Sequence, residues 1–296
     1  MKLTRRESLG ILACTIAANA AGRQLENEWR RIARDTDGTV GAAALNPVSR
    51  TQVSLNGGER FPLASVCKLP IAMHMLALVD EGKFTRNQLI EVLPQDVVKS
   101  VSPIAARWPA ETQFRLDEMI ELMVAQSDNT AVETFFRLEG PAVTPRLRRW
   151  QIEGVRVDRP ESQCNRDRRA GFKQFLNDPR DTGTPNGTAE LLSRLVRGEL
   201  LSPPSTARMM EILKATTTFA TRLKGLLPPG TVVAHKTGSS GVEHGIAAAT
   251  NDSGVILLPN GGQIAVSVYL KASTRSDTER DSIIARIARA AFDAKW

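Results

Sequence analysis

The stretch FPLASVCKLPIAMHML, residues 61–76, begins the segment on which the fold depends. Its apolar run continues to residue 80 and predicts a helix, yet Ser65 and Lys68 interrupt it near the start. Residues three apart on a helix face the same side, so the Lys68 ammonium would lie beside the Ser65 hydroxyl. A capping serine and a snorkelling lysine would give the same pattern, and S-x-x-K arises by chance about once in a chain of this length.

The segments on either side of this helix predict alternating sheet and helix regions. Before it, we expect a helix over residues 25–34 and a hairpin of two strands, TVGAAALN and TQVSLN. After it, helical periodicity continues to about Lys214, as in LDEMIELMVAQ (116–126) and TAELLSRLVRG (188–198). Strands are then expected at TVVAHK (231–236), AAATNDSGVILLP (247–259) and QIAVSVYLKAS (263–273), with turns at 238–241 and 260–262 and a closing helix over 277–292.

This order predicts an α+β fold with two lobes. One five-stranded antiparallel sheet would be built from both ends of the chain and flanked by the N- and C-terminal helices. We expect residues 21–60 and 213–296 to form this sheet lobe, and residues 61–212 to form an inserted all-helical lobe. The helical lobe would include a long polar loop at about 158–187, and the active site would lie between the lobes.

Two further triplets strengthen the pattern at Ser65 and Lys68. Ser127-Asp128-Asn129 directly follows the 116–126 helix, and Lys236-Thr237-Gly238 ends a strand. Each triplet is expected by chance in only about a few per cent of such chains. Because they occur in order, and in fitting secondary structure, the three motifs together form a strong signal.

With these motifs the chain resembles the penicilloyl-serine transferases, and most closely the class A β-lactamases, which carry S-x-x-K, S-D-N and K-T-G. The resemblance covers nearly all of the chain after residue 20. Arg159-Pro160-Glu161-Ser162-Gln163-Cys164-Asn165 resembles the R-x-E-x-x-x-N segment of that family's Ω loop, and DPRDTGTP (178–185) resembles its closing stretch. The resemblance implies a hydrolase that acts on the cyclic amide of β-lactams and gives antibiotic resistance.

The chemistry gives these residue types their roles in acylation. Ser65 becomes an effective nucleophile only if a neighbour removes its proton during attack. Lys68 could do so if burial and a helix N-terminus lower its pKa, and Glu161 acting through a water is the rival base. The resemblance implies that the backbone N–H groups of Ser65 and Ser239 bind the oxyanion, where one such donor is worth about 3 kcal/mol of barrier.

The remaining motif residues are implied to bind substrate and protonate the leaving nitrogen. Ser127 would deliver that proton with Lys236 nearby, and Asn129 would hydrogen-bond the amide of the substrate's side chain. Lys236 and Thr237 would hold the carboxylate of the β-lactam nucleus. We name Arg222 as a second carboxylate anchor, because the strand at 247–252 has no arginine; a surface arginine without a role is the alternative.

Deacylation separates the candidate functions. Glu161 and Asn165 could position and deprotonate a water, which predicts rapid hydrolysis of the acyl-enzyme and hence a β-lactamase. A penicillin-binding D,D-peptidase shares the other motifs but lacks this pair, and a non-hydrolysing β-lactam sensor would acylate and stop. Glu161 and Asp181 lie 20 positions apart, several more than is usual for the Ω loop, which predicts an altered substrate range. Val101 stands where this family often has an aromatic residue.

Composition limits partners and location. The chain has 296 residues, 42% of them hydrophobic, and a net charge of +7, but its arginines are interspersed with acidic residues and do not indicate nucleic-acid binding. Residues 1–20 match a signal peptide cleaved after Ala20; TRRESL resembles a twin-arginine signal, and Cys14 is a weak lipidation candidate. We therefore expect an exported monomer, periplasmic or secreted, without stable membrane insertion and with a small-molecule β-lactam as its partner.

The cysteines and histidines complete the set of reactive groups. Cys67 and Cys164 could form a disulfide in an oxidising compartment, but two buried free thiols are the preferred interpretation. His235 and His244 have no accompanying cluster of metal ligands, so we expect neither a metal site nor a cofactor.

Overall fold

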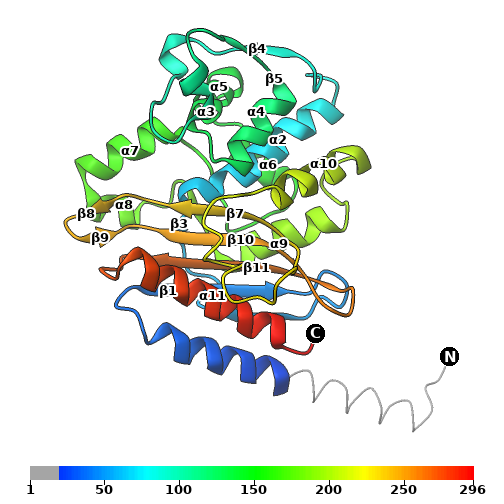
Figure 1. The fold of residues 1–296 in the computed structure, drawn as a ribbon, viewed down its shortest axis with the longest axis vertical. Coiled ribbons are helices and arrows are strands. Elements are labelled where there is room, and N and C mark those ends of the chain that lie inside the picture. Colours follow the sequence, from blue (N-terminus) through cyan, green and yellow to red (C-terminus); the bar gives the residue numbers. More distant parts are fainter. Residues whose placement is uncertain (1–19) are drawn as a thin grey trace, which may run out of the picture.

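A computed structural model describes residues 20–296 (Figure 1). Residues 1–19, which carry most of the predicted export signal and Cys14, lie outside the described residues. Residues 20–33 form a helix, followed by the hairpin of β1 (Thr39–Leu45) and β2 (Gln52–Leu55). This agrees with the expected first helix and hairpin.

The five-stranded antiparallel sheet predicted from both ends of the chain is confirmed. Its strand order is β2, β1, β11 (Gln263–Lys271), β10 (Thr250–Leu257) and β7 (Val233–Ser239), so β7 forms one edge. In β11, Ile264, Val266, Val268 and Leu270 face the helix of residues 20–33 and α11 (Asp277–Asp293), while Ala265 and Tyr269 join the core on the other side. This alternation is the period of two that a strand covered on both faces requires.

The middle of the chain forms the second lobe, above the sheet in Figure 1. The nucleophile segment begins it with the 3₁₀ helix η1 (Ala64–Cys67) and α2 (Lys68–Asp80). The other elements up to residue 214 are β3 (Phe61–Pro62), β4 (Leu89–Glu91), η2 (Pro94–Asp96), α3 (Pro103–Arg107), β5 (Gln113–Arg115), α4 (Leu116–Ala125), α5 (Asn129–Glu139), α6 (Val143–Arg149), α7 (Glu161–Ala170), α8 (Phe172–Asn177), β6 (Thr182–Gly183), α9 (Pro185–Val196) and α10 (Pro203–Lys214). The short strands β8 (Val242–Glu243) and β9 (Ile246–Ala247) extend from the end of β7.

Three details differ from the expectations. The segment expected to be all-helical contains two short antiparallel pairs, β3 with β6 and β4 with β5. The stretch expected to be a polar loop at 158–187 contains α7, α8 and the start of α9, which Thr184 caps by accepting from Gly187 N at 3.0 Å. The turn expected to begin at Gly238 begins later, because Gly238 still pairs with Asn251 in the ladder of β7 and β10. Helix α7 escaped prediction because ESQCNRDRRA has no apolar stripe.

A buried histidine in α2, His74, is expected to make the stability of the fold depend on pH. His74 is 2% exposed, and its Nδ1 lies 3.3 Å from Arg146 Nε. Burial, and then the Arg146 charge, lower the pKa of His74 to about 4. Glu81, Lys83, Glu139 and Arg149 are the other charged groups around it.

We expect the free energy of unfolding to fall by about 2 kcal/mol through His74 as the pH drops from 6.5 to 4.5. The folded pKa lies below that of an unfolded histidine, so the unfolded state binds more protons in this window and stability rises with pH. Urea unfolding of the wild type and of His74→Gln at several pH values measures the slope. An equally steep slope in His74→Gln would contradict this assignment.

Candidate active site

Ser65 lies on η1, directly before α2. Ala64 before it has a left-handed backbone with φ +46°, and η1 continues into α2 without a break. Gly238 of β7 packs against this segment so closely that a Cβ there would lie 2.7 Å from Leu63 O and 3.1 Å from Ser65 N. The edge strand and the Ser65 backbone can therefore meet only because residue 238 has no side chain.

Lys68 is fully buried and surrounded by oxygen atoms. Its Nζ lies 2.6 Å from Asn129 Oδ1, 2.7 Å from Ser127 O, and 3.0 Å from the hydroxyls of Ser65 and Ser127. Burial lowers the pKa of Lys68. Asn129 Oδ1 and Ser127 O can only accept hydrogen bonds, so the neutral amine of Lys68 would donate its two N–H groups to them. Its lone pair would then face a serine hydroxyl.

Ser127 lies between α4 and α5 with φ +62°. The next residue, Asp128, caps α5 by accepting from Ala131 N at 2.9 Å, and its other oxygen accepts from Ile104 N at 2.8 Å. Asp128 thus holds the turn that directs the Ser127 hydroxyl toward the two lysines. Asn129 has both ends of its amide occupied, since Nδ2 donates to Ser100 O at 2.9 Å.

Strand β7 brings Lys236, Thr237 and Ser239 to the same site. Lys236 is fully buried, donates to Thr237 O at 2.8 Å and lies 3.2 Å from Ser127 Oγ. Burial, together with the Lys68 charge, lowers the pKa of Lys236 to about 7. The Thr237 hydroxyl lies 2.6 Å from that of Thr218.

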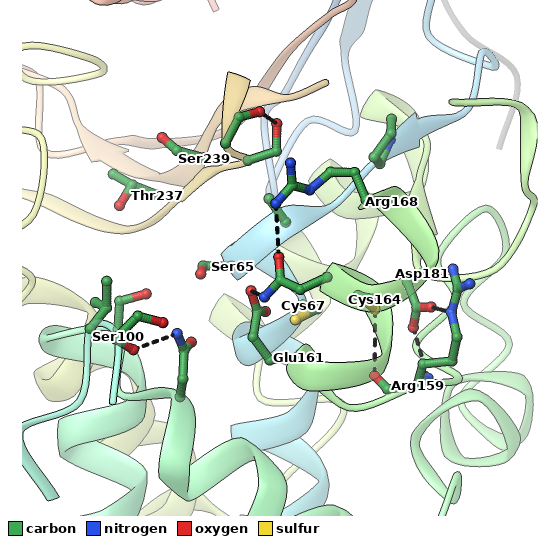
Figure 2. Close-up of a pocket in the computed structure, with 18 of the residues that line it drawn as sticks. Ser65, Cys67, Ser100, Arg159, Glu161, Cys164, Arg168, Asp181, Thr237 and Ser239 are labelled. Atoms are coloured by element: carbon green, nitrogen blue, oxygen red, sulfur yellow. Dashed lines mark hydrogen bonds and ion pairs between the residues drawn. The ribbon is translucent and has the colours of Figure 1, made fainter. Parts of the chain in front are cut away.

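Glu161 and Asn165 lie one turn apart on α7, and both line the cavity that Ser65 also lines. Figure 2 shows Glu161 and Ser65 at this cavity. Asn165 Nδ2 donates to Glu161 Oε1 at 3.0 Å. Within the described chain, no direct hydrogen bond joins the Glu161 carboxylate to Ser65 or Lys68. Helix α7 is attached to α5 because Ser162 N and Oγ donate to the Glu133 carboxylate at 2.7 and 3.0 Å.

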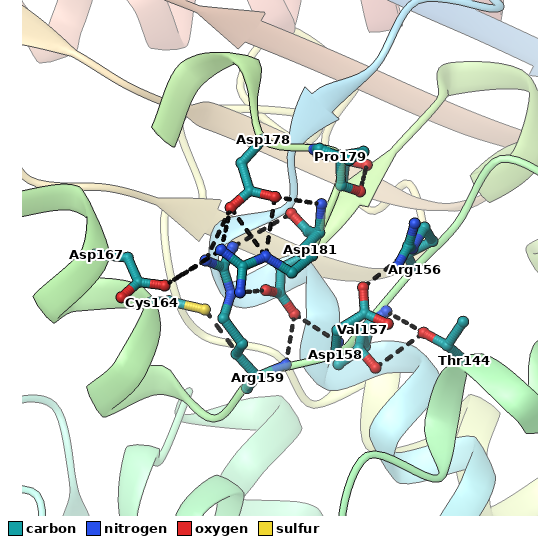
Figure 3. A network of polar contacts seen from close by, with 12 residues as sticks. Thr144, Arg156, Val157, Asp158, Arg159, Cys164, Asp167, Asp178, Pro179 and Asp181 are labelled. Atoms are coloured by element: carbon teal, nitrogen blue, oxygen red, sulfur yellow. Dashed lines mark hydrogen bonds and ion pairs between the residues drawn. The ribbon is translucent and has the colours of Figure 1, made fainter. Parts of the chain in front are cut away.

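Arg159 anchors the segment that carries α7 (Figure 3). Its side chain is 3% exposed and donates to Asp181 and Asp167, each at 2.5 Å, and to Asp178 at 3.0 Å. Asp181, with φ +51°, also accepts from the backbone N–H groups of Asp158 and Arg159 at 2.7 and 3.0 Å. These ion pairs join Arg159, at the start of the segment, to Asp167, Asp178 and Asp181, and so hold its two ends together.

Arg222 is buried behind β7, not on the surface. It donates to Asp281 at 2.7 Å, to Gly238 O and Asn251 O at 3.0 Å, and to Ser239 Oγ at 2.6 Å. The alternative that Arg222 lies on the surface is therefore wrong. Its guanidinium reaches the site through the Ser239 hydroxyl, and direct contact with a substrate carboxylate stays a prediction.

One cavity of about 400 Å³ between the lobes is lined by Ser65, Ser127, Asn129, Glu161, Asn165, Thr237 and Ser239. Lys68 and Lys236 lie behind its wall, in contact with the serine hydroxyls. Five of its lining residues have left-handed backbones although they are not glycine: Ala64, Val101, Ser127, Asp181 and Phe219. Such conformations cost about 1–3 kcal/mol each and gather at functional sites. The structure thus brings together every motif residue named from the sequence except Arg222, which supports the wall from behind.

Comparison with known proteins identifies the chain. Residues 24–294 match the model described as the Beta-lactamase enzyme family. The chain belongs to this family. The β-lactamase described here is 32% identical to Beta-lactamase VEB-1 of Pseudomonas aeruginosa over 98% of this chain and 97% of that one. It is 36% identical to Extended-spectrum beta-lactamase PER-1 of the same organism, over 86% and 82% of the two chains.

A solved structure supports the class. An ancestral (GNCA) class A β-lactamase superposes with a TM-score of 0.79 at 32% identity, covering 90% of this chain and 98% of that chain. The protein is a class A serine β-lactamase, a hydrolase that opens the β-lactam amide and provides antibiotic resistance.

Other reactive groups of this β-lactamase are not arranged for metal or disulfide chemistry. Cys67 and Cys164 are both free, and burial raises the pKa of both thiols, that of Cys67 to about 12. His235 is buried with Nδ1 2.9 Å from Asp252, and His244 is exposed. Residues 20–296 contain no group of three His, Cys, Asp or Glu side chains that could hold a metal ion.

Sequence reasoning missed several residues that support the site of this β-lactamase. Glu133 and Thr218 each bond to a site residue or its helix, and no pattern in their own segments points to that role. Asp128 lies in the Ser127-Asp128-Asn129 triplet, but the sequence assigned it no role of its own. Arg168 of α7 is also buried at the cavity, with 6% exposure. A single arginine within a run of charged residues carries no such signal in sequence.

Proposed function

We propose that Ser65 forms the acyl-enzyme and that Lys68 accepts its proton. The observation that carries this proposal is the chain of contacts from Ser65 Oγ to Lys68 Nζ, Ser127 Oγ and Lys236 Nζ, at 3.0, 3.0 and 3.2 Å. Burial lowers the pKa of Lys68, which increases the fraction of this amine that is neutral and available as a base. Glu161 acting through a water is the rival route for the same step.

The oxyanion is proposed to bind the backbone N–H groups of Ser65 and Ser239. Both residues line the cavity, and the close approach of Gly238 to Ser65 N supports their convergence. Donors that are held in place before the charge develops lower the barrier without reorganisation.

The leaving nitrogen is proposed to take its proton from Ser127. The Ser127 hydroxyl lies within 3.2 Å of both lysine amines, so its proton can be replaced through them. Lys236, Thr237 and Ser239 would bind the carboxylate of the β-lactam nucleus, and Arg222 would support them through Ser239. Asn129 would hydrogen-bond the side-chain amide of the substrate.

Glu161 and Asn165 are proposed to position and deprotonate the water that hydrolyses the acyl-enzyme. Their 3.0 Å contact and their place on the cavity wall support this role. The D,D-peptidase and the non-hydrolysing sensor considered from the sequence would both stop at the acyl-enzyme.

The location and organisation of the protein complete the proposal. Residues 1–20 would direct export to the periplasm or the medium, where the enzyme would act as a monomer on small-molecule β-lactams. Among residues 20–296 no helix is long and apolar enough to cross a membrane. Residues 21–60 and 213–296 would form the sheet lobe and residues 61–212 the second lobe.

Mixing the purified protein with a chromogenic cephalosporin, with and without EDTA, tests the proposed route. We expect many turnovers per molecule at a rate that the chelator leaves unchanged, because only protein side chains are assigned to the chemistry. One equivalent of product followed by arrest would indicate the peptidase or the sensor. Loss of turnover with EDTA would contradict the serine route.

A further inference from the structure

Arg168 is the buried cation of α7. Arg166 and Arg169 on the same helix are exposed, whereas Arg168 is 6% exposed. A guanidinium cannot lose its proton in a protein, so a buried one must be matched by acceptors. The identity of these acceptors indicates what Arg168 does.

The guanidinium of Arg168 donates to two acceptors, Glu243 and Asn165. Nη1 forms an ion pair with Glu243 of β8, and Nη2 donates to Asn165 Oδ1 at 3.2 Å. Figure 2 shows Arg168 at the edge of the cavity. The turn after β7 also packs here, since a Cβ on Gly241 would lie 3.2 Å from Nη1. Arg168 therefore joins α7 to the β8–β9 hairpin across the edge of the cavity.

The contact with Arg168 determines how the Asn165 amide is oriented. A guanidinium only donates hydrogen bonds, so it must face the amide oxygen and not the amide nitrogen. The nitrogen then points to Glu161, where Nδ2 donates to Oε1 at 3.0 Å. A rotated amide would place two donors against each other at Arg168 and two acceptors against each other at Glu161.

We propose that Arg168 is a positioning residue for deacylation, which acts on Glu161 through the amide of Asn165. The ion pair with Glu243 holds the guanidinium in place, and the remaining lone pair of Asn165 Oδ1 is left for the hydrolytic water. This inference rests on the proposed roles of Glu161 and Asn165. It adds a residue that touches neither Ser65 nor Lys68.

Within the part of the chain that the structure describes, Arg168 has no contact with the groups proposed to carry out acylation, so its loss should affect deacylation alone. Ser65, Lys68, Ser127 and Lys236 lie on η1, α2, the turn before α5, and β7, and in the described chain Arg168 bonds only to Asn165 and Glu243. Loss of Arg168 should therefore slow hydrolysis of the acyl-enzyme without slowing its formation.

Pre-steady-state kinetics of Arg168→Met with a chromogenic cephalosporin test this. We expect the deacylation rate constant to fall by about 10-fold or more, as for other residues that orient a catalytic ligand, with the acylation rate constant within about twofold of wild type. The acyl adduct on Ser65 should accumulate in mass spectra. Arg166→Met, on the exposed side of the same helix, is the matched control and should change neither rate.

A double-mutant cycle with Asn165→Ala separates positioning from general damage. If Arg168 acts through Asn165, Arg168→Met should change deacylation by less than about twofold in the Asn165→Ala background. If Arg168→Met does not fold, Arg168→Lys serves in its place, because one ammonium cannot copy the fork that serves both Glu243 and Asn165. That variant should also slow deacylation alone.

Three results would overturn the proposal: unchanged deacylation in the Arg168 variant, an equal loss of acylation, or an undiminished effect in the Asn165→Ala background. A failure of the proposed function is distinguishable, because it would show as normal deacylation in Glu161→Ala. In that case the Arg168 effect would have no carboxylate to act on.

Discussion

Glu161→Ala is expected to convert the enzyme from a catalyst into a protein that binds one β-lactam covalently and stops. Ser65, Lys68, Ser127 and Lys236 keep their mutual contacts in this variant, so acylation should proceed. Deacylation should fall by about 10³-fold, within the range for loss of a general base. Steady-state hydrolysis of a chromogenic cephalosporin and intact-protein mass spectrometry, which should show one adduct on Ser65, measure the two effects.

The matched control for this experiment is Glu153→Ala. Glu153 is an exposed acid outside the cavity, so its loss should leave turnover unchanged. Undiminished hydrolysis by Glu161→Ala would remove Glu161 from the mechanism. Failure of that variant to acylate would instead assign the first proton transfer to Glu161.

Lys68→Met is expected to block the other half of the reaction. Among residues 20–296, Lys68 is the buried amine that contacts Ser65 Oγ, so without it the rate of acylation should fall by about 10³-fold. Stopped-flow measurement of the burst determines this rate, and thermal unfolding shows whether the variant folds, because Asn129 Oδ1 and Ser127 O also lose their donor.

Lys214→Met controls for the loss of a lysine, since Lys214 is exposed at the end of α10. If Lys68→Met acylates at nearly the wild-type rate, the proton of Ser65 leaves by the rival route through Glu161. A slow burst in Lys68→Met together with a normal burst in Glu161→Ala would assign the first proton transfer to Lys68.

The sheet could be predicted from the sequence because each strand carries its own signal. Segments such as QIAVSVYLKAS alternate with period two and end at turn residues, and β11 follows that pattern from 263 to 271. The helix α4 was equally clear, with apolar residues at helical spacing from Leu116. The spacing of apolar residues shows which face of a helix or strand is buried, and this burial stabilises most of the elements that were predicted.

The segment between Asp158 and Gly187 could not be predicted in the same way. Helix α7 has few apolar residues, and the contacts that hold it are ion pairs and hydrogen bonds to residues far along the chain, such as Ser162 to Glu133 and Arg168 to Glu243. Such pairs leave no periodic trace, because a charged residue on an exposed face and one in a buried pair look alike in sequence.

The catalytic motifs were visible because acyl transfer needs fixed residue types at short spacing. Ser65 with Lys68, and Lys236 with Thr237, are such pairs. The supporting residues were harder to find, because they act through contacts that only the folded chain brings together. Glu133 accepts from Ser162 N, and the Thr218 hydroxyl contacts that of Thr237. Arg222 was named from the sequence as a carboxylate anchor, but its bond to Ser239 from behind β7 was not foreseen.

The site is divided between two pieces of chain that are held by different forces. The serine and both lysines belong to elements fixed by the apolar core and the sheet, whereas Glu161, the proposed base for deacylation, lies on a polar helix fastened by the Arg159 ion pairs. Substitutions in α7 can therefore occur with little loss of stability in the elements that carry the serine and the lysines. A variant that lost only the ion pairs that hold α7 would still bind one antibiotic molecule covalently. It would then protect its host stoichiometrically, in proportion to the number of protein molecules made.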